Sequence, residues 1–259
     1  MKTIVANWKM NVGVRESVAL ARGTLLTLRG RKLVPELVIC PPFVALSEVR
    51  KVVARSAAAL GAQNVFWEDS GAYTGEISPR MLVELGVTHA IVGHSERRTI
   101  LGETDEMVNK KVLHTLASKI TPIVCVGESR AEHQAGKTQE AVLHQLKTAL
   151  SGVRLRVTDR LLIAYEPLWA IGSGQAASVS EIVETHTFIR SVLQELFHER
   201  GAGQMRVLYG GSVDGENAYG FLREPQVDGV LVGSASVKIN QFKDIVHAAC
   251  EVLEAQQKD

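Results

Sequence analysis

Residues 161–174 read Leu-Leu-Ile-Ala-Tyr-Glu-Pro-Leu-Trp-Ala-Ile-Gly-Ser-Gly. The first five are mostly apolar and predict a buried strand, which Pro167 ends because proline donates no hydrogen bond to a neighbouring strand. Residues 178–181, Ser-Val-Ser-Glu, match a capping box that opens a long helix. The stretch therefore predicts a strand–loop–helix unit, with Glu166 at the point where strand becomes loop.

The loop of this unit is largely apolar and contains two glycines. Apolar side chains can cover a ligand, exposed glycine N–H groups can bind an anion, and a carboxylate at the loop's root can transfer a proton. For a lone glutamate, a solvated strand-to-helix connection would be the better interpretation; the rest of the chain favours a lid. The predicted lid consists of Pro167, Leu168, Trp169, Ala170, Ile171, Gly172, Ser173 and Gly174.

Short apolar runs alternate with helical periodicity along the whole chain, which is typical of repeated strand–helix units and a parallel sheet. Ser78 and Pro79 match one helix start, with a serine cap and a proline in the first turn. We expect eight strands, at residues 3–9, 37–40, 58–63, 89–93, 120–126, 161–166, 207–209 and 229–232. We expect helices or turns at residues 14–28, 44–55, 79–85, 105–117, 139–150, 179–199, 216–221 and 241–256.

Eight such units in 259 residues fit an α/β fold, a closed (β/α)8 barrel with a parallel eight-stranded sheet. An open doubly wound sheet, which usually has fewer strands, is the alternative. No linker, charge block or low-complexity tract divides the chain, so residues 1–259 are expected to form one domain. In a barrel the active site is built from loops at the carboxyl ends of the strands, and the residues there are the functional candidates.

Composition narrows the function classes. The net charge is +1, from 29 basic and 28 acidic residues, so no long-range field favours nucleic acid or an anionic membrane. Three widely spaced cysteines, Cys40, Cys125 and Cys250, indicate reduced thiols and neither zinc nor disulfides. The first residues lack a long apolar segment, and no run reaches the length of a membrane span. A soluble, cytoplasmic protein without a metal is expected.

The first strand delivers a cation between two amides. The sequence is Asn7-Trp8-Lys9-Met10-Asn11, and in an extended strand Asn7, Lys9 and Asn11 would share one face. A lysine that faces the barrel interior is costly unless it meets an anion, such as a substrate phosphate or an enolate oxygen. A Schiff-base lysine is a second functional interpretation, and a surface lysine at a strand end is the ordinary one.

A histidine follows the fourth strand, in residues 94–98, His-Ser-Glu-Arg-Arg. The ring of His94 can accept a hydrogen bond from a backbone N–H of the turn that follows, and such a donor, with the helix dipole, disfavours the imidazolium. His94 would then be neutral and could act as an electrophile; alternatively it bonds a neighbouring carbonyl. Glu96, Arg97 and Arg98 are expected to form structural ion pairs, with a catalytic role for Glu96 left open.

Two glycine-containing loops follow the seventh and eighth strands, at residues 209–213 and 231–236. Barrels bind phosphate at these loops through backbone N–H groups, and glycine lets the backbone approach the anion. A single Gly-Gly-Ser is as consistent with a tight turn, but two such loops on adjacent strands favour a phosphate site. No arginine lies in residues 166–177, 209–216 or 229–237, so backbone N–H groups are expected to hold the anion.

The third loop, residues 64–77, is too long for a simple connection and carries three aromatic residues. Long structured loops are usually functional or buried against a partner. A homodimer contact is the first interpretation, and a loop packed on itself is the second.

Residues 7–11, 93–98, 164–174 and 209–212 together resemble the triosephosphate isomerase family, over the full length of the chain. Several separate motifs in the family's order make the resemblance specific. It implies a TIM barrel and a cofactor-free isomerase that interconverts dihydroxyacetone phosphate and D-glyceraldehyde 3-phosphate through an enediolate, a step of glycolysis and gluconeogenesis. It also implies a cytoplasmic homodimer.

The resemblance assigns roles to individual positions. Glu166 matches the base, His94 the electrophile and Lys9 the electrostatic stabiliser; a glutamate base beside a neutral histidine is the arrangement known for this family. Ile171 and Leu231 match an apolar clamp around the base, and Thr74 matches the tip of a loop that enters the neighbouring subunit's site. The matching substrate-binding positions are Asn7, Lys9, Asn11, Gly172, Ser212, Leu231, Gly233 and Ser234.

Three places depart from the family's usual pattern. Ser234 replaces a glycine, which a backbone contact tolerates only at a negative φ. Leu168 and the pair Gln175-Ala176 alter the two hinges of the lid, where closure is absorbed. Phosphate affinity and lid kinetics are the properties in question. Two alternatives from other classes are a Schiff-base aldolase that uses Lys9 covalently and a catalytically silent scaffold or binding protein.

Overall fold

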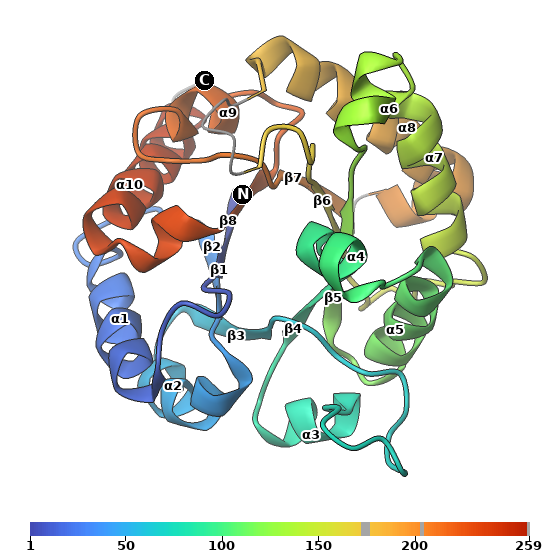
Figure 1. Cartoon of the computed structure of the whole chain (residues 1–259). Coiled ribbons are helices and arrows are strands. Elements are labelled where there is room, and N and C mark those ends of the chain that lie inside the picture. The colour runs from blue at the N-terminus through green and yellow to red at the C-terminus, as the bar shows by residue number, and fades with distance from the viewer. Residues whose placement is uncertain (172–176, 203–204, 258–259) are drawn as a thin grey trace.

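The computed structural model describes residues 1–171, 177–202 and 205–257. These residues form eight parallel strands that pair in sequence order and close into a barrel, with the helices arranged around it (Figure 1). The strands are β1 (Thr3–Asn7), β2 (Glu36–Cys40), β3 (Ala58–Ala62), β4 (His89–Val92), β5 (Thr121–Val126), β6 (Leu161–Tyr165), β7 (Met205–Tyr209) and β8 (Gly229–Val232). The (β/α)8 barrel expected from the sequence is confirmed, and the open doubly wound sheet is excluded.

The helices connect successive strands and begin near the predicted positions. Ser78 accepts a hydrogen bond from the Met81 N–H, and Ser178 and Glu181 bond each other's N–H groups, so both predicted caps are confirmed. The α-helices are α1 (Val14–Leu26), α2 (Leu46–Val53), α3 (Pro79–Glu84), α4 (Ser95–Leu101), α5 (Asp105–Ala117), α6 (Arg130–Gln134), α7 (Thr138–Ala149), α8 (Val179–Ala202), α9 (Ala218–Leu222) and α10 (Ile239–Ala255), with 3-10 turns η1 (Phe43–Ala45) and η2 (Ser234–Val237).

Two of these helices were not predicted as elements: α4 and α6. Both are short and begin shortly after the end of a strand, α4 after β4 and α6 after β5. A helix this short contains too few residues for a repeating pattern of apolar positions to be recognised in the sequence. Strand β1 also ends earlier than predicted, at Asn7 and not at residue 9. These three differences all lie on the face of the barrel where function is expected.

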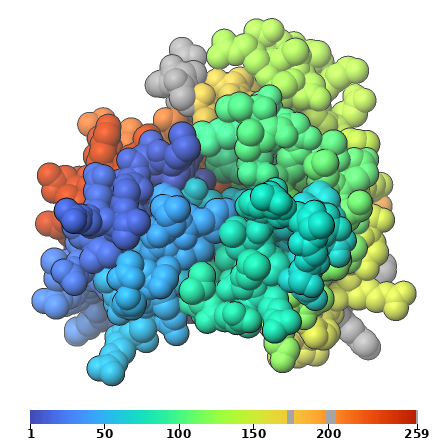
Figure 2. Space-filling model, turned by 60° about the horizontal axis from the view of Figure 1, so that its bottom comes forward, coloured from blue at the N-terminus to red at the C-terminus, as the bar shows by residue number. Residues whose placement is uncertain are grey.

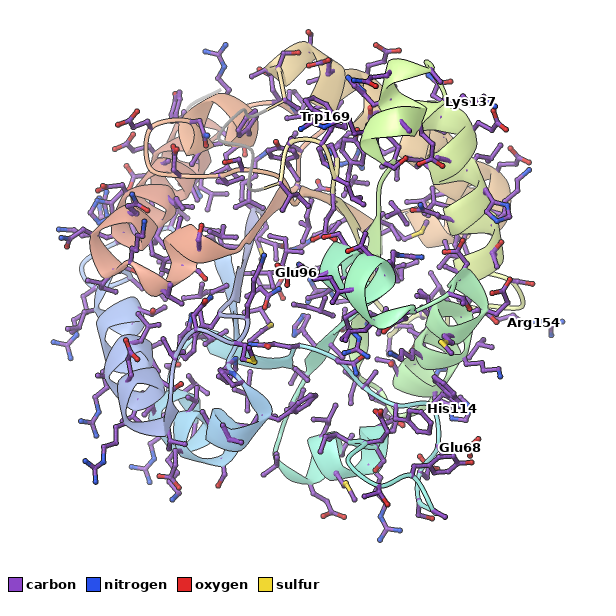
Figure 3. The ribbon with its side chains drawn as sticks, in the orientation of Figure 1. Glu68, Glu96, His114, Lys137, Arg154 and Trp169 are labelled. Carbon is purple, nitrogen blue, oxygen red and sulfur yellow. The ribbon has the colours of Figure 1, made fainter. Side chains whose placement is uncertain are left out.

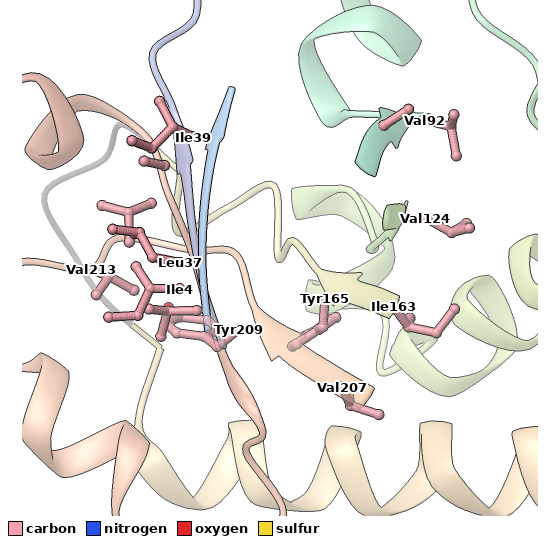
Figure 4. Close-up of a cluster of buried hydrophobic side chains, with 14 of the residues drawn as sticks. Ile4, Leu37, Ile39, Val92, Val124, Ile163, Tyr165, Val207, Tyr209 and Val213 are labelled. Atoms are coloured by element: carbon pink, nitrogen blue, oxygen red, sulfur yellow. The ribbon is translucent and has the colours of Figure 1, made fainter. Parts of the chain in front are cut away.

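Alternate strand residues divide between two apolar layers. The barrel interior holds Val5, Val38, Ile91, Ile123 and Leu208 among others. Their neighbours along the strands point outward and pack under the helices. Figure 4 shows nine of these strand residues, Ile4, Leu37, Ile39, Val92, Val124, Ile163, Tyr165, Val207 and Tyr209, together with Val213 from the loop after β7. Side chains alternate in this way because consecutive Cβ atoms of a strand point to opposite faces.

Closure of the barrel depends on a close approach between β8 and β1. Gly229 pairs with Thr3, and a Cβ atom at position 229 would stand 1.9 Å from the Thr3 carbonyl oxygen. No side chain fits at that distance, so glycine is required for the last strand to reach the first.

Within the described residues, no helix combines the length and the apolar character that crossing a bilayer requires. The three cysteines are unpaired and buried.

A charged cluster lies at the amino-terminal end of the barrel, opposite the expected site. Glu36 accepts hydrogen bonds from Arg160 at 2.6 and 2.7 Å and from Arg206 at 2.7 Å, with the His89 ring 3.8 Å away. Burial alone would raise the pKa of Glu36, but Arg160, His89 and Arg206 together lower it to about 2. Burial lowers the pKa of His89 and of His186, on α8, to about 4.

These shifts predict acid sensitivity in two pH windows. The unfolded chain binds protons at histidines from pH 6.5 downward while folded His89 and His186 resist until about pH 4, so the unfolding free energy falls across that interval. Each histidine contributes up to about 3 kcal/mol to the fall. The contribution of Glu36 is present above pH 4.5 and is lost as the pH falls toward 2.

Urea unfolding of the wild type and of His186→Asn, measured from pH 7 to pH 4, tests the first window. The variant should lose stability less steeply with falling pH, whereas His144→Asn, at a side chain that is 74% exposed, should keep the wild-type slope. Equal slopes for the wild type and His186→Asn would contradict the assignment.

Candidate active site

A cavity of about 370 Å³ opens at the carboxyl ends of the strands. Its lining includes all the predicted catalytic residues and every predicted substrate-binding residue that the structure describes: Asn7, Lys9, Asn11, His94, Glu166, Ser212, Leu231, Gly233 and Ser234. Ile171 and Glu96 also line it, and Figure 3 shows Glu96 on α4 over the centre of the barrel. The predicted lid and hinge residues Gly172, Ser173, Gly174, Gln175 and Ala176 lie outside the described residues.

The carboxylate of Glu166 is buried and held at two points. Glu166 is only 2% exposed. Its Oε2 accepts a hydrogen bond from the Ser95 N–H at 2.8 Å, and its Oε1 lies 3.1 Å from Nε2 of His94. A buried carboxylate needs such donors to offset the loss of its hydration. Ser95 is the first residue of α4, so the partial positive charge of the helix terminus also faces the carboxylate.

His94 caps the same helix. Its Nδ1 accepts a hydrogen bond from the Glu96 N–H at 3.2 Å, as the sequence predicted, and therefore carries no proton. The ring is then the neutral tautomer with its proton on Nε2, the atom that faces Glu166. The alternative, a bond from the ring to a neighbouring carbonyl, is not what the structure shows at Nδ1.

Lys9 reaches the cavity by a different route from the one predicted. The strand stops at Asn7, and Lys9 has φ of +51°, in the left-handed region, stabilised by its N–H bonding Asn7 Oδ1 at 3.1 Å. The prediction that Asn7, Lys9 and Asn11 share a strand face is therefore wrong, because a turn and not an extended backbone joins them. The turn still brings all three into the cavity lining.

The ammonium of Lys9 meets an anion inside the protein. Its Nζ lies 2.6 Å from Glu96 Oε1, and the two side chains are 25% and 46% exposed. Gly233 lies alongside, since a Cβ atom there would stand 3.1 Å from Lys9 Cε and 3.4 Å from Nζ. A glycine at 233 thus leaves space for the lysine beside the loop after β8.

The backbone of the loop after β8 accommodates the serine that replaces glycine at position 234. Ser234 begins the 3-10 turn η2, and it is not among the described residues with positive φ. A serine is compatible with that backbone, so the replacement of glycine creates no strain at this point.

A buried ionic network supports the β4–α4 corner. Glu103 accepts hydrogen bonds from the Gly93 N–H at 2.9 Å, from Arg97 and from Lys111 at 2.6 Å, and Lys111 also bonds Asn64 Oδ1 at 2.7 Å. Burial would raise the pKa of Glu103, but Lys111 and Arg97 hold it below its usual value. Gly93 has φ of +70° and lies directly before His94, so this network fixes the backbone that aims the histidine.

The arginines of the predicted ion-pair set are structural in this arrangement. Arg97 bonds Glu103, and Arg98 bonds Asp105, the Gly93 carbonyl and the Cys125 carbonyl. Cys125 lies beside the base, and burial first, then the Glu166 carboxylate, raises the pKa of its thiol. The thiol is therefore kept neutral next to Glu166.

The first residues of the predicted lid are anchored to a second buried carboxylate, Glu128. Trp169 Nε1 donates to Glu128 Oε1 at 2.7 Å, the Tyr165 hydroxyl lies 3.1 Å from both carboxylate oxygens, and the Leu168 N–H donates to the Glu128 carbonyl at 3.1 Å. Leu168, the departure at the first hinge, is thus held by its backbone, which any residue other than proline could provide.

The third loop packs partly on itself. Phe66 stacks on Trp67 with ring centroids 4.1 Å apart and contacts Tyr73 at 4.8 Å. Tyr73 remains 45% exposed and Thr74 is exposed. In Figure 2 the teal segment that contains this loop stands at the front of the molecule.

A groove of about 490 Å³ adjoins the active-site cavity. It shares Asn7, Lys9, His94 and Glu96 with that cavity. Three apolar side chains on its edge are largely exposed: Met10 at 96%, Val44 at 75% and Leu101 at 64%. Exposed apolar side chains gathered beside a polar site are typical of a surface that another chain covers.

Sequence reasoning missed several residues that hold the site. Ser95, Glu103 and Glu128 act through partners 71, 8 and 41 positions away, Glu166, Lys111 and Trp169. Gln63 was missed too, although its amide bonds the Lys9 carbonyl at 2.9 Å. Only Ser95 carried a signal, since the first N–H groups of a helix are free to bind an anion.

Comparison with known proteins places this geometry in a family. Residues 2–249 match the family model described as triosephosphate isomerase. The chain is 47% identical to the triosephosphate isomerase of Caldanaerobacter subterraneus subsp. tengcongensis, over 94% of this chain and 98% of the relative, and 44% identical to that of Aquifex aeolicus, over 95% and 99%. The crystal structure of triosephosphate isomerase from Bartonella henselae superposes with a TM-score of 0.85 at 36% identity, covering 98% of this chain and 99% of that one.

The ionic network yields a prediction about stability. Glu103→Gln keeps the shape of the side chain and an acceptor for Gly93, but leaves the Lys111 ammonium and Arg97 without their counter-charge. Because the side chains of Lys111 and Glu103 are each 3% exposed, the loss should be about 3 kcal/mol. Urea unfolding at pH 7 measures it, and Glu184→Gln on the exposed face of α8 is the control. A loss no larger than that of the control would show that the network contributes nothing.

Proposed function

The chain belongs to the triosephosphate isomerase family, and from that premise we propose how its site interconverts dihydroxyacetone phosphate and D-glyceraldehyde 3-phosphate, the isomerase step of glycolysis. Glu166 removes the proton beside the substrate carbonyl. His94 and Lys9 face the oxygens on which negative charge develops. Asn7 and Asn11 complete the polar wall of the cavity.

One observation carries this proposal: the carboxylate of Glu166 lies 3.1 Å from the single N–H of a neutral His94, in the cavity that also contains Lys9. Removing a proton next to a carbonyl creates an enediolate, so a base and an oxyanion donor are needed side by side. Since His94 has only one proton to donate, Glu166 has to release this N–H before it can bond the substrate oxygen. The base and the electrophile therefore hold each other in the resting site and separate in the reaction.

The substrate phosphate is held by backbone N–H groups of Gly172, Ser212, Gly233 and Ser234 in this proposal. The cavity lining supports it, since Ser212, Gly233 and Ser234 stand together at the ends of β7 and β8 and the described lining contains no arginine. Lys9 supplies the nearby positive charge and alternates between Glu96 and the substrate. No cofactor or metal takes part in these steps, and among the described residues no group of acidic, histidine and cysteine side chains is placed to bind a metal.

The loop 167–174 acts as a lid in this mechanism. Ile171 and Leu231 clamp the base from its apolar side, and both line the cavity. Excluding water strengthens the bonds to the enediolate and keeps the intermediate from losing its phosphate.

A homodimer completes the proposal. Thr74 at the tip of the third loop would enter the groove of a second copy and support its Lys9 and Asn11. The exposed Met10, Val44 and Leu101 on that groove favour this arrangement.

We also propose that residues 1–259 act as one domain, which the closed barrel favours, and that the protein is cytoplasmic, which its three free cysteines favour.

A coupled isomerase assay tests the function, and Glu166→Asp tests the base. Aspartate keeps the charge but withdraws the carboxylate by about 1 Å, which can cost on the order of 100-fold in rate. That loss corresponds to roughly 2.7 kcal/mol of transition-state stabilisation and should appear in kcat with KM nearly unchanged.

The stability of Glu166→Asp is measured in parallel, because the bond to Ser95 is buried and weakening it can cost about 1 to 3 kcal/mol. A folded variant that keeps more than about one third of the wild-type kcat, against the loss expected for a misplaced base, would remove Glu166 from the catalytic role.

The dimer is tested by shortening the third loop. Deleting most of residues 66–76 should give a folded monomer of low activity, because Thr74 no longer reaches its neighbour. Val44→Glu, on the groove, should also favour the monomer, whereas Leu26→Glu, which is 53% exposed on α1, should not. Sedimentation reports the assembly. A shortened protein that stays dimeric and fully active would show that the loop only packs on itself.

A further inference from the structure

The indole of Trp169 is held on one edge and on one face. Its edge donates to Glu128 at 2.7 Å, as described above. Its face stacks on the imidazole of His133, on α6, with ring centroids 4.1 Å apart and planes 23° from parallel. Figure 3 shows Trp169 in the loop beside α6. The start of the lid is thus clamped between a buried carboxylate and an aromatic ring that can change its charge.

His133 touches both members of the clamp. Its Nδ1 lies 3.5 Å from Glu128 Oε1, the same oxygen that accepts the Trp169 N–H. The His133 side chain is 34% exposed, so it exchanges protons with solvent, whereas Glu128 is fully buried. Imidazole is the side chain that ordinarily changes charge between pH 5 and pH 8.

We propose that His133 is a positioning residue whose charge sets how firmly Trp169, and with it the start of the lid, is held. The proposal rests on the lid and base assigned under the proposed function. Neutral His133 offers a stacked ring. Protonated His133 places a cation over the indole face and forms an ion pair with Glu128, and both contacts tighten the clamp.

The charged groups around His133 come from its own helix α6, the segment before α6 and the start of α8. Glu128 lies before α6 and Glu181 lies in the first turn of α8; Ser178 principally, and His133 in smaller part, lower the pKa of Glu181. On the helix of His133, Arg130 donates a hydrogen bond to the Trp169 carbonyl at 3.4 Å, and the Glu132 carboxylate accepts one from the Ser129 N–H. Tyr165 faces Glu128 as a neutral hydroxyl. The carboxylates near the imidazole are therefore those of Glu128 and Glu181.

The clamp acts on the reaction through the chain. Glu166 stands three residues before Trp169, and Leu168 between them is tied by its N–H to Glu128. Since Glu166 has to leave His94 for the histidine to reach the substrate, any tightening at Trp169 opposes that movement. Protonation of His133 should therefore slow turnover without touching the substrate.

The test compares kcat/KM from pH 8 to pH 5.5 for the wild type, His133→Phe and His133→Arg. Phenylalanine keeps the stack without a charge, and arginine carries a fixed one. All three share the titration of the substrate phosphate, near pH 6. From pH 8 to pH 5.5, kcat/KM of the wild type should fall about threefold further than kcat/KM of His133→Phe. A factor of this size corresponds to the free energy of a partly exposed cation–π contact. At pH 8, kcat/KM of His133→Arg should be about threefold below that of the wild type, and at lower pH its profile should run parallel to that of His133→Phe.

Two controls separate positioning from folding. His144→Phe changes an exposed histidine on α7 and should keep the wild-type profile. His133→Gln, a second neutral variant, should reproduce the shape of the His133→Phe profile if the phenylalanine variant folds poorly. A merely structural role would lower activity by the same factor at every pH, and parallel profiles for the wild type and both neutral variants would overturn the proposal.

Tryptophan emission provides a readout that needs no turnover. A cationic imidazole stacked on Trp169 should change the emission between pH 8 and pH 5.5, and the change should be absent in His133→Phe and present in His144→Phe. If the wild type shows no isomerase activity, the proposed function fails while the emission still reports the clamp. An emission change that is identical in the wild type and His133→Phe would overturn the clamp itself.

Discussion

Closure of the sheet between β8 and β1 is the constraint on which the site depends. The ends of β1, β4, β6, β7 and β8 meet around one cavity only because the last strand reaches the first, and that contact requires a glycine at 229. The inward-facing layer is apolar and fully buried, so the polar groups begin where the strands end. At this end of the barrel the charged groups surround a mouth whose floor is apolar, and electrostatic interactions are stronger there than in water.

A single short helix, α4, organises the charges at that mouth. Its cap is His94, the proposed electrophile; its first N–H holds Glu166, the proposed base, and its second N–H fixes the tautomer of the histidine. The same helix supplies Glu96 to Lys9. Because these groups lie within three consecutive residues, their relative positions are set by helix geometry, and the Glu103 network beneath fixes the helix to the barrel.

The sequence was sufficient for the parts of the site that depend on local pattern. Glu166 and His94 follow apolar strands, so parallel strand order alone brings them to one mouth. Lys9 was placed in the right cavity for the wrong reason, since no pattern distinguishes an extended lysine from one in a left-handed turn. Glu103 and Glu128 could not be predicted, because each acts through a partner that only the folded chain brings near. Ser95 could have been suspected as the start of a helix, but its partner Glu166 is 71 positions away. The short helices α4 and α6 are too brief for periodicity to reveal.

The two buried carboxylates near the base differ in what surrounds them, and that difference separates a rigid part of the site from a movable one. Glu103 is matched by two cations and a backbone N–H, so loosening it separates buried ion pairs. Glu128 accepts hydrogen bonds from two neutral donors, the Tyr165 hydroxyl and the Trp169 N–H, and His133 Nδ1 lies further away, at 3.5 Å. Releasing one neutral donor costs less than separating an ion pair, so the Trp169 side of the base can move while the His94 side stays fixed. The proposed mechanism, in which Glu166 leaves His94 during the reaction, needs this asymmetry.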